Sequence, residues 1–108
     1  MDEARYNQLV AAAFQRLLLA LDRVDPDLLD ADSTGEMVTI TSASGQKVVV
    51  NTQRAARQIW VAGKGLGVHF SYQDDGRWLD DKGKGLELFA FVADAVEAAA
   101  GVRLEFAG

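Results

Sequence analysis

The stretch that decides the fold is residues 37–72, MVTITSASGQKVVVNTQRAARQIWVAGKGLGVHFSY. The period of two is clear at its start, where Val38 and Ile40 alternate with Thr39 and Thr41. A period of two is typical of strands that bury one face. With a further short strand after the turn signal Asp-Asp-Gly, the sequence predicts antiparallel strands over residues 37–41, 46–51, 58–62, 68–72 and 77–80.

The segments on either side of this stretch have the 3.6-residue period of amphipathic helices. It predicts helices over residues 3–21 and 86–100, with Asp2 as the first N-cap and Gly101 as the last C-cap. Two helices with one apolar face each are most simply buried on the same side of the sheet. We therefore expect one α+β domain over residues 1–108, a two-layer sandwich with two helices on one face of a five- to six-stranded antiparallel sheet.

Composition excludes several classes of protein. The chain has 108 residues, of which 49% are hydrophobic and 25% charged, which is the composition of a globular domain and not of a disordered one. Cysteine is absent, which excludes disulfide frameworks and thiolate zinc sites. We find no apolar run long enough to cross a membrane and no signal peptide, and so expect a cytoplasmic protein with no membrane partner.

The charge is segregated along the chain. Residues 22–36 carry six acids and one base, which accounts for the whole net charge of −5. We call these six acids the acidic strip: Asp22, Asp25, Asp27, Asp30, Asp32 and Glu36. Residues 37–73 contain no acid and four bases. Because the net charge is negative, nucleic acid is not expected as a partner.

Several uncommon residues agree in order and spacing with a known family. They are Asn51-Thr-Gln53, Gln58-Ile-Trp60-Val-Ala62 and Gly67-Val-His69-Phe70, with Trp78 and Lys82-Gly-Lys-Gly85 further on. In these pieces the chain resembles the frataxin family, and its bacterial branch in particular, over nearly its whole length. The resemblance implies a frataxin-like fold and an iron-binding protein of iron–sulfur cluster assembly. It also implies binding to the cysteine desulfurase and scaffold protein, regulation of sulfur transfer, and a role as iron donor or sensor.

The chain departs from the family pattern in two places. Where members often carry acids late in the first helix, this chain has Gln15-Arg-Leu-Leu-Leu-Ala-Leu21. Where members usually have proline before the Gln-x-Trp piece, it has Arg54-Ala-Ala-Arg57. The first departure implies weaker or fewer iron sites, and the second a different grip on a partner.

The acidic strip has three interpretations. Carboxylates in close sequence repel one another, and their oxygens suit hard cations such as Mg²⁺, Ca²⁺, Mn²⁺ and iron. From the residues alone, a solvated loop is the simpler interpretation. The resemblance favours weakly bound Fe²⁺ or Fe³⁺ at an open surface site formed by the six acids. A third interpretation is that the strip attracts a basic partner surface.

A second candidate surface lies on the sheet. If the helices cover the Ile59 side, strand alternation places Trp60 on the opposite face beside Gln58, as expected of an interface anchor. The alternative is that Trp60 lies in the core; Trp78 is expected to be mainly core. The resemblance implies that the partner-binding residues are Asn51, Gln53, Gln58 and Trp60.

The sequence offers little support for an enzymatic function. There is no G-x-S-x-G elbow, and the glycine-rich segments do not match the P-loop spacing. His69, the single histidine, is expected to be a partly exposed strand residue. The alternatives to an iron-binding regulator are an acidic docking module with incidental metal binding, and a ferroxidase or iron-storage protein. We expect a monomer that forms oligomers only with metal.

Overall fold

The computed structural model describes residues 1–106. Along the chain, one helix comes first, six strands follow, and a second helix comes after them. The elements are α1 (Glu3–Leu21), β1 (Leu29–Ser33), β2 (Met37–Ser42), β3 (Lys47–Gln53), β4 (Gln58–Gly63), β5 (Leu66–Tyr72), β6 (Trp78–Asp80) and α2 (Leu88–Ala100). None of the helices in this part of the chain is long and apolar enough to cross a membrane.

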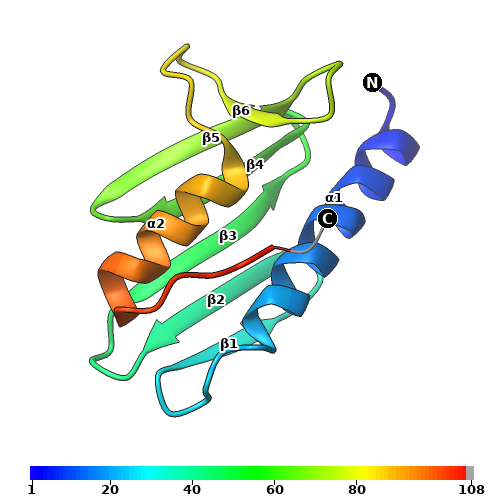
Figure 1. The fold of residues 1–108 in the computed structure, drawn as a ribbon. Coiled ribbons are helices and arrows are strands. Elements are labelled where there is room, and N and C mark those ends of the chain that lie inside the picture. Colours follow the sequence, from blue (N-terminus) through cyan, green and yellow to red (C-terminus); the bar gives the residue numbers. More distant parts are fainter. Residues whose placement is uncertain (107–108) are drawn as a thin grey trace.

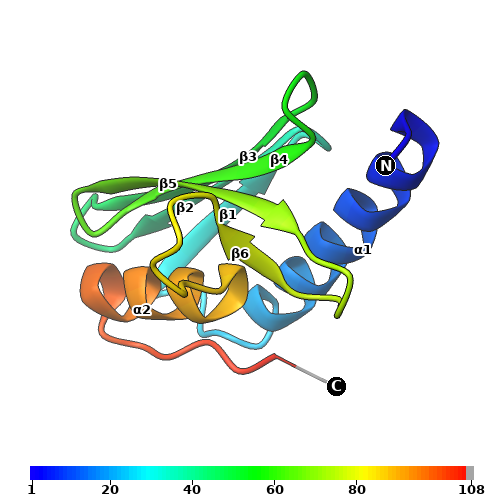
Figure 2. The same cartoon turned by 90° about the horizontal axis from the view of Figure 1, so that it is seen from above.

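The strands form one antiparallel sheet in the order β1-β2-β3-β4-β5-β6. Both helices lie on the same face of this sheet, and the opposite face is uncovered (Figures 1 and 2). The expected two-layer α+β sandwich is therefore confirmed. We call the uncovered side the outer face.

The strand β1 is not among the five strands predicted from the sequence, because the acidic strip shows little apolar alternation. Leu29–Ser33 pairs with β2 in register from Leu29 opposite Ser42 to Ser33 opposite Val38. Leu29 is buried and Ala31 is half-buried, so the strand contributes an apolar side to the sandwich. Charged side chains on an edge strand also discourage pairing with another chain. An edge strand of this kind does not have the apolar alternation by which strands are recognised.

The core lies between the helices and the inner face of the sheet. Tyr6 of α1 is fully buried, and its hydroxyl donates to the carbonyl oxygen of Gln58 at 2.6 Å. Trp78 is only 3% exposed, which confirms its place in the core. On β4, Ile59 and Val61 are buried as expected.

The second helix begins at Leu88, two residues later than expected. The side chain of Glu87 accepts hydrogen bonds from the amides of Phe89 and Ala90, and so acts as the N-cap. At the other end Gly101 adopts a left-handed conformation with φ of 72°. That conformation is easily accessible to glycine and ends the helix.

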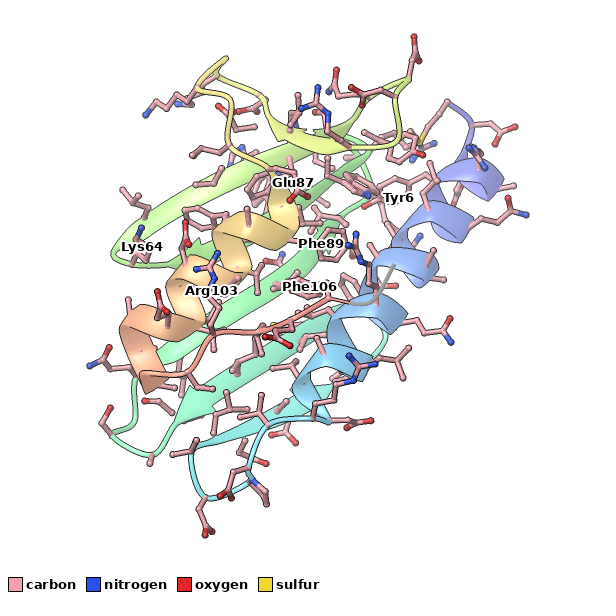
Figure 3. All side chains as sticks on the ribbon, in the orientation of Figure 1. Tyr6, Lys64, Glu87, Phe89, Arg103 and Phe106 are labelled. Carbon is pink, nitrogen blue, oxygen red and sulfur yellow. The ribbon has the colours of Figure 1, made fainter. Side chains whose placement is uncertain are left out.

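The segment after α2 runs back between the two helices (Figures 1 and 3). Leu104 is buried, and the ring of Phe106 packs edge-on against that of Phe89 at 5.0 Å between centroids. The guanidinium of Arg16 lies 4.3 Å from the centre of the Phe89 ring. Residues 102–106 form no strand, and through Leu104 and Phe106 they cover the core between the two helices.

Candidate functional site

The acidic strip begins at the end of α1 and continues along β1. All six carboxylates are exposed. Asp30 and Asp32 alternate with the inward-facing Ala31, so both lie on the solvent side of the edge strand. Asp25 accepts a hydrogen bond from the amide of Asp27 at 2.9 Å, which fixes the turn between helix and strand.

One member of the strip is neutralised by a basic side chain of the same chain. Glu36 forms an ion pair with Arg54 and accepts a hydrogen bond from the Thr52 hydroxyl. These two bonds, the arginine first, lower the pKa of Glu36 below its ordinary value. Arg54 also donates to Asn7 of α1, so this group fastens the β3–β4 turn to the helix. Glu36 is thereby less available to an external cation than its place in the sequence suggests.

The other five acids have no basic partner. Among the ion pairs of residues 1–106, none involves Asp22, Asp25, Asp27, Asp30 or Asp32. Within the same residues, no three Asp, Glu or His side chains come close enough together to hold a metal ion. The strip is thus an uncompensated anionic edge and not a preformed chelating cage. A cation here would be held by one or two carboxylates and by water.

The four polar and aromatic side chains expected to bind a partner share one patch of the outer face. In the register of β3 and β4, Asn51 is opposite Trp60 and Gln53 is opposite Gln58. Residues directly opposite each other in an antiparallel pair lie on the same face of the sheet. All four are half-buried, as side chains on an uncovered sheet face should be. The alternative position of Trp60 in the core is therefore excluded.

A hydrogen-bond network fixes this patch. The indole N–H of Trp60 donates to Oε1 of Gln58 at 2.9 Å. The amide nitrogen of Gln58 donates in turn to Ser71 and to Asp81, each at 3.1 Å. Because both ends of the Gln58 amide are engaged, the indole is held in one orientation and its ring remains available for contact.

His69 belongs to the same patch, a contact with Trp60 that is not among the sequence predictions. The two rings stack with centroids 3.9 Å apart and planes 8° from parallel. Nδ1 of His69 lies 3.6 Å from the Asp81 carboxylate. The signal that could have found this contact is the two-residue turn Lys64-Gly65, which sets the register of β4 and β5 and places His69 opposite Trp60.

The late exposed face of α1 carries Gln15 and Leu19 and no carboxylate. Leu17, Ala20 and Leu21 are buried in the core, whereas Leu19 is 52% exposed. This side of the helix thus presents leucine and not carboxylate, and the anionic surface starts only at Asp22.

The fold defines the structural class of the protein: a small two-layer sandwich with an acidic edge and an open polar–aromatic sheet face. A family model described as a frataxin-like domain matches residues 1–102. The chain belongs to the frataxin family.

Named relatives cover nearly the whole chain. It is 34% identical over 104 residues to the iron-sulfur cluster assembly protein CyaY of Tolumonas auensis, covering 96% of this chain and 97% of the relative. It is 36% identical over 106 residues to the protein of the same name from Pseudoalteromonas atlantica, covering 98% and 95%. A solved frataxin from Psychromonas ingrahamii superposes with a TM-score of 0.88 at 24% identity, over 100% of both chains. That structure is evidence for the fold.

Proposed function

We propose that this protein takes part in iron–sulfur cluster assembly and regulates it by docking to the cysteine desulfurase and scaffold protein, with iron bound weakly at the acidic strip. Iron–sulfur cluster assembly is the process named in the names of its relatives. The observation that carries the proposal is the edge formed by the end of α1 and by β1, where five exposed aspartates lack basic partners among residues 1–106. Such an edge attracts either a cation or a basic protein surface.

In this proposal the two surfaces have different tasks. The acidic strip steers a basic surface of the desulfurase and holds Fe²⁺ or Fe³⁺ as donor or sensor. The outer-face patch of Asn51, Gln53, Gln58 and Trp60 contacts the scaffold protein, with the immobilised indole as its apolar anchor.

The second candidate is an acidic docking module in which metal binding is incidental. It is favoured by the absence, among the described residues, of any three acids or histidines close enough to hold an ion. The two candidates predict the same contact with a basic partner. They differ in whether iron changes the outcome.

A sulfur-transfer assay separates them. Sulfide production by purified desulfurase and scaffold is measured with the domain added, with and without Fe²⁺. We expect the domain to change the rate, and the change to depend on iron. The triple variant D25N/D27N/D30N should lose the effect, whereas the matched variant E3Q/D74N/E105Q, with the same change in charge, should keep it.

Other results would contradict the iron-dependent proposal. If the domain alters the rate equally with and without iron, the docking module is the correct function. If the two triple variants behave alike, the acidic strip has no specific role. A parallel Fe²⁺ titration followed by NMR should perturb the amide signals of residues 22–36 before those of the rest of the chain.

A further inference from the structure

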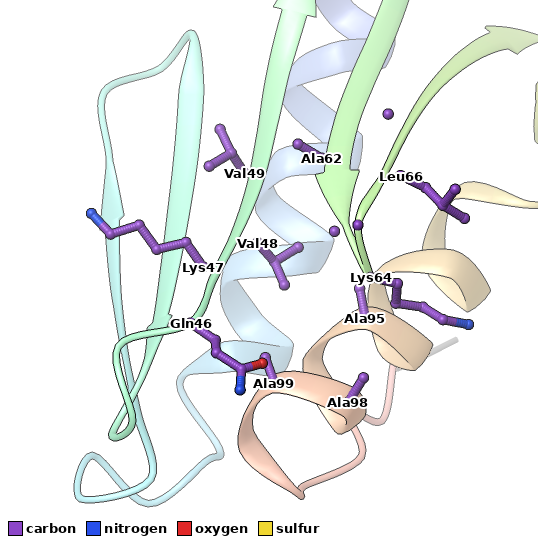
Figure 4. A pocket seen from close by; sticks show the side chains of 13 residues that line it. Gln46, Lys47, Val48, Val49, Ala62, Lys64, Leu66, Ala95, Ala98 and Ala99 are labelled. Carbon is purple, nitrogen blue, oxygen red and sulfur yellow. The ribbon is translucent and has the colours of Figure 1, made fainter.

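The β2–β3 hairpin and the β4–β5 hairpin separate from each other at the end of the sheet remote from the β3–β4 turn. β3 and β4 are paired from Gln53–Gln58 as far as Val49–Ala62. Beyond that point β3 continues only with β2, and β4 only with β5. A cavity of about 680 Å³ lies where the two hairpins diverge, lined on the α2 side by Ala95, Ala98 and Ala99 (Figure 4).

A second cavity adjoins the first across β5. It has a volume of about 240 Å³, and Leu66 and Gly67 line both cavities. Its other walls include Val68, His69 and Leu86. Leu66 is 54% exposed and forms the ridge between the two hollows. An exposed leucine between two cavities is a point at which an apolar side chain from a partner can be buried.

All four lysines of the chain line these cavities. Lys47 and Lys64 border the larger one, and Lys82 and Lys84 border the smaller. In the described residues, none of them forms an ion pair. We call these four lysines and Leu66 the lysine surface.

Two acids, Asp80 and Asp81, also line the smaller cavity, and each accepts hydrogen bonds from groups other than a lysine ammonium. Asp80 accepts hydrogen bonds from three backbone amides, and Asp81 accepts one from Gln58. Asp94 is paired with Arg103, and Lys64 makes only a smaller contribution to lowering its pKa. The ammonium groups therefore remain available to an external anion.

We propose that the lysine surface binds an acidic segment of a partner protein, in which carboxylates meet the lysines and an apolar side chain packs beside Leu66. The cavities supply an apolar floor and the lysines a cationic rim, which together fit a short peptide carrying both kinds of side chain. This proposal does not depend on iron, and the lysine surface comes nearest to the acidic strip where Lys47 and Asp30 lie on either side of Thr41 of β2.

Charge favours a short segment over a long polyanion. The net charge of the chain is −5, so an extended nucleic acid or an anionic membrane also meets the repulsion of the rest of the molecule. Exposed charges act over about 8 Å at physiological ionic strength. A short peptide therefore interacts mainly with the local lysines.

The test uses the whole protein and an N-acetylated peptide of sequence GDELDELG, titrated by NMR. We expect saturable shifts of the Lys64, Leu66 and Gly67 amides. K47E/K64E should weaken binding at least tenfold, and L66S about fivefold. The matched variant R5E/R23E, which reverses two exposed charges elsewhere, should bind normally. A peptide without leucine, GDEGDEGG, should bind at least fivefold more weakly.

Four results would overturn the proposal. They are no saturable shift at the lysine surface, equal weakening in R5E/R23E, equal binding of the two peptides, or tighter binding of single-stranded DNA or anionic vesicles through the same lysines. NMR spectra of the free protein at increasing concentration provide a further test. If both the lysine surface and the acidic strip shift on concentration, the occupant is a second copy of this chain, and the peptide assignment is wrong.

Discussion

The two tryptophans show how position on a strand determines the role of a residue. Trp60 lies on the outer face, stacked on His69, whereas Trp78 is 3% exposed and part of the core. The same side chain therefore serves contact at one site and stability at the other. The sequence predicted both positions, and for Trp60 the basis was strand parity with the buried Ile59 and Val61.

Replacing each tryptophan with alanine should separate these roles. Trp60→Ala should lower the free energy of unfolding by about 0.5–1.5 kcal/mol, the value of a lost aromatic contact. Trp78→Ala should lower it by about 3–5 kcal/mol, because it leaves a cavity in the core. Urea denaturation of both variants measures the difference. Equal losses would mean that Trp60 is a core residue.

Gly63 is required by a close approach and not by its backbone conformation. A Cβ atom at this position would lie 2.8 Å from the Cβ of Ala95 on α2. The strand and the helix can therefore meet here only if residue 63 has no side chain.

Gly63→Ala should cost about 1–3 kcal/mol of stability through overpacking. Gly67→Ala is the matched control, because no atom lies within 4 Å of the Cβ it would add. It should be close to neutral. In urea denaturation, Ala95→Gly should recover part of the loss in the Gly63→Ala background; a double variant no more stable than the single one would place the strain elsewhere.

At the scale of elements, Asp80 organises the connection from β6 to α2. Its carboxylate accepts hydrogen bonds from the amides of Lys82, Lys84 and Leu86. These bonds, the one from Lys84 first, lower the pKa of Asp80 below its ordinary value of 3.8. The Lys82-Gly-Lys-Gly85 piece noted in the sequence is thus wrapped around a carboxylate.

Because the pKa of Asp80 is lowered in the folded protein, its ionised form stabilises the fold at neutral pH. That stabilisation is lost as the pH falls below 3.8 and through the folded pKa. Asp80→Asn should lower the urea midpoint at pH 7, and the difference from the parent should narrow towards pH 3. Asp74→Asn, at the exposed β5–β6 turn, is the control. A difference independent of pH would contradict this account.

Elements with strong apolar patterns were predictable, and those fixed by neighbours were not. The helices and five strands have a clear period of 3.6 or two. β1 has only Leu29 and Ala31 on its inner side, and it is a strand because β2 supplies its hydrogen-bond partners. The helix α2 begins at Leu88 and not at the expected residue 86, because Glu87 is its N-cap.

At the scale of the whole molecule, aspartates and lysines are concentrated on different strands of the sheet and come nearest where Asp30 and Lys47 flank Thr41. The unpaired aspartates lie at the edge formed by β1, and the four lysines gather around the far end of β3 and β4 and around β5. Such a distribution orients the protein toward charged partners. It also leaves like charges close together at the acidic edge.

Neutralising the acidic edge should stabilise the fold at low salt. In D22N/D27N/D30N/D32N, which keeps the Asp25 turn, the Tm should rise by about 4–8 °C, the change that about 1 kcal/mol makes in a small domain. The effect should appear at about 10 mM salt and nearly vanish at about 1 M, where the screening length falls to about 3 Å. Calorimetry at both salt concentrations measures it, with E3Q/D74N/E105Q as the control. A rise that persists at high salt would exclude repulsion as its cause.

The sequence by itself determined the two-layer sandwich, the outer-face position of Trp60 and the presence of a concentrated acidic segment. Each of these follows from local periodicity or composition, which a single chain displays directly. Only the tertiary structure decided that Glu36 is paired with Arg54, that His69 stacks on Trp60, and that the lysines meet around two joined cavities. Such facts depend on register and on where hairpins diverge, since these bring together residues that are remote along the chain.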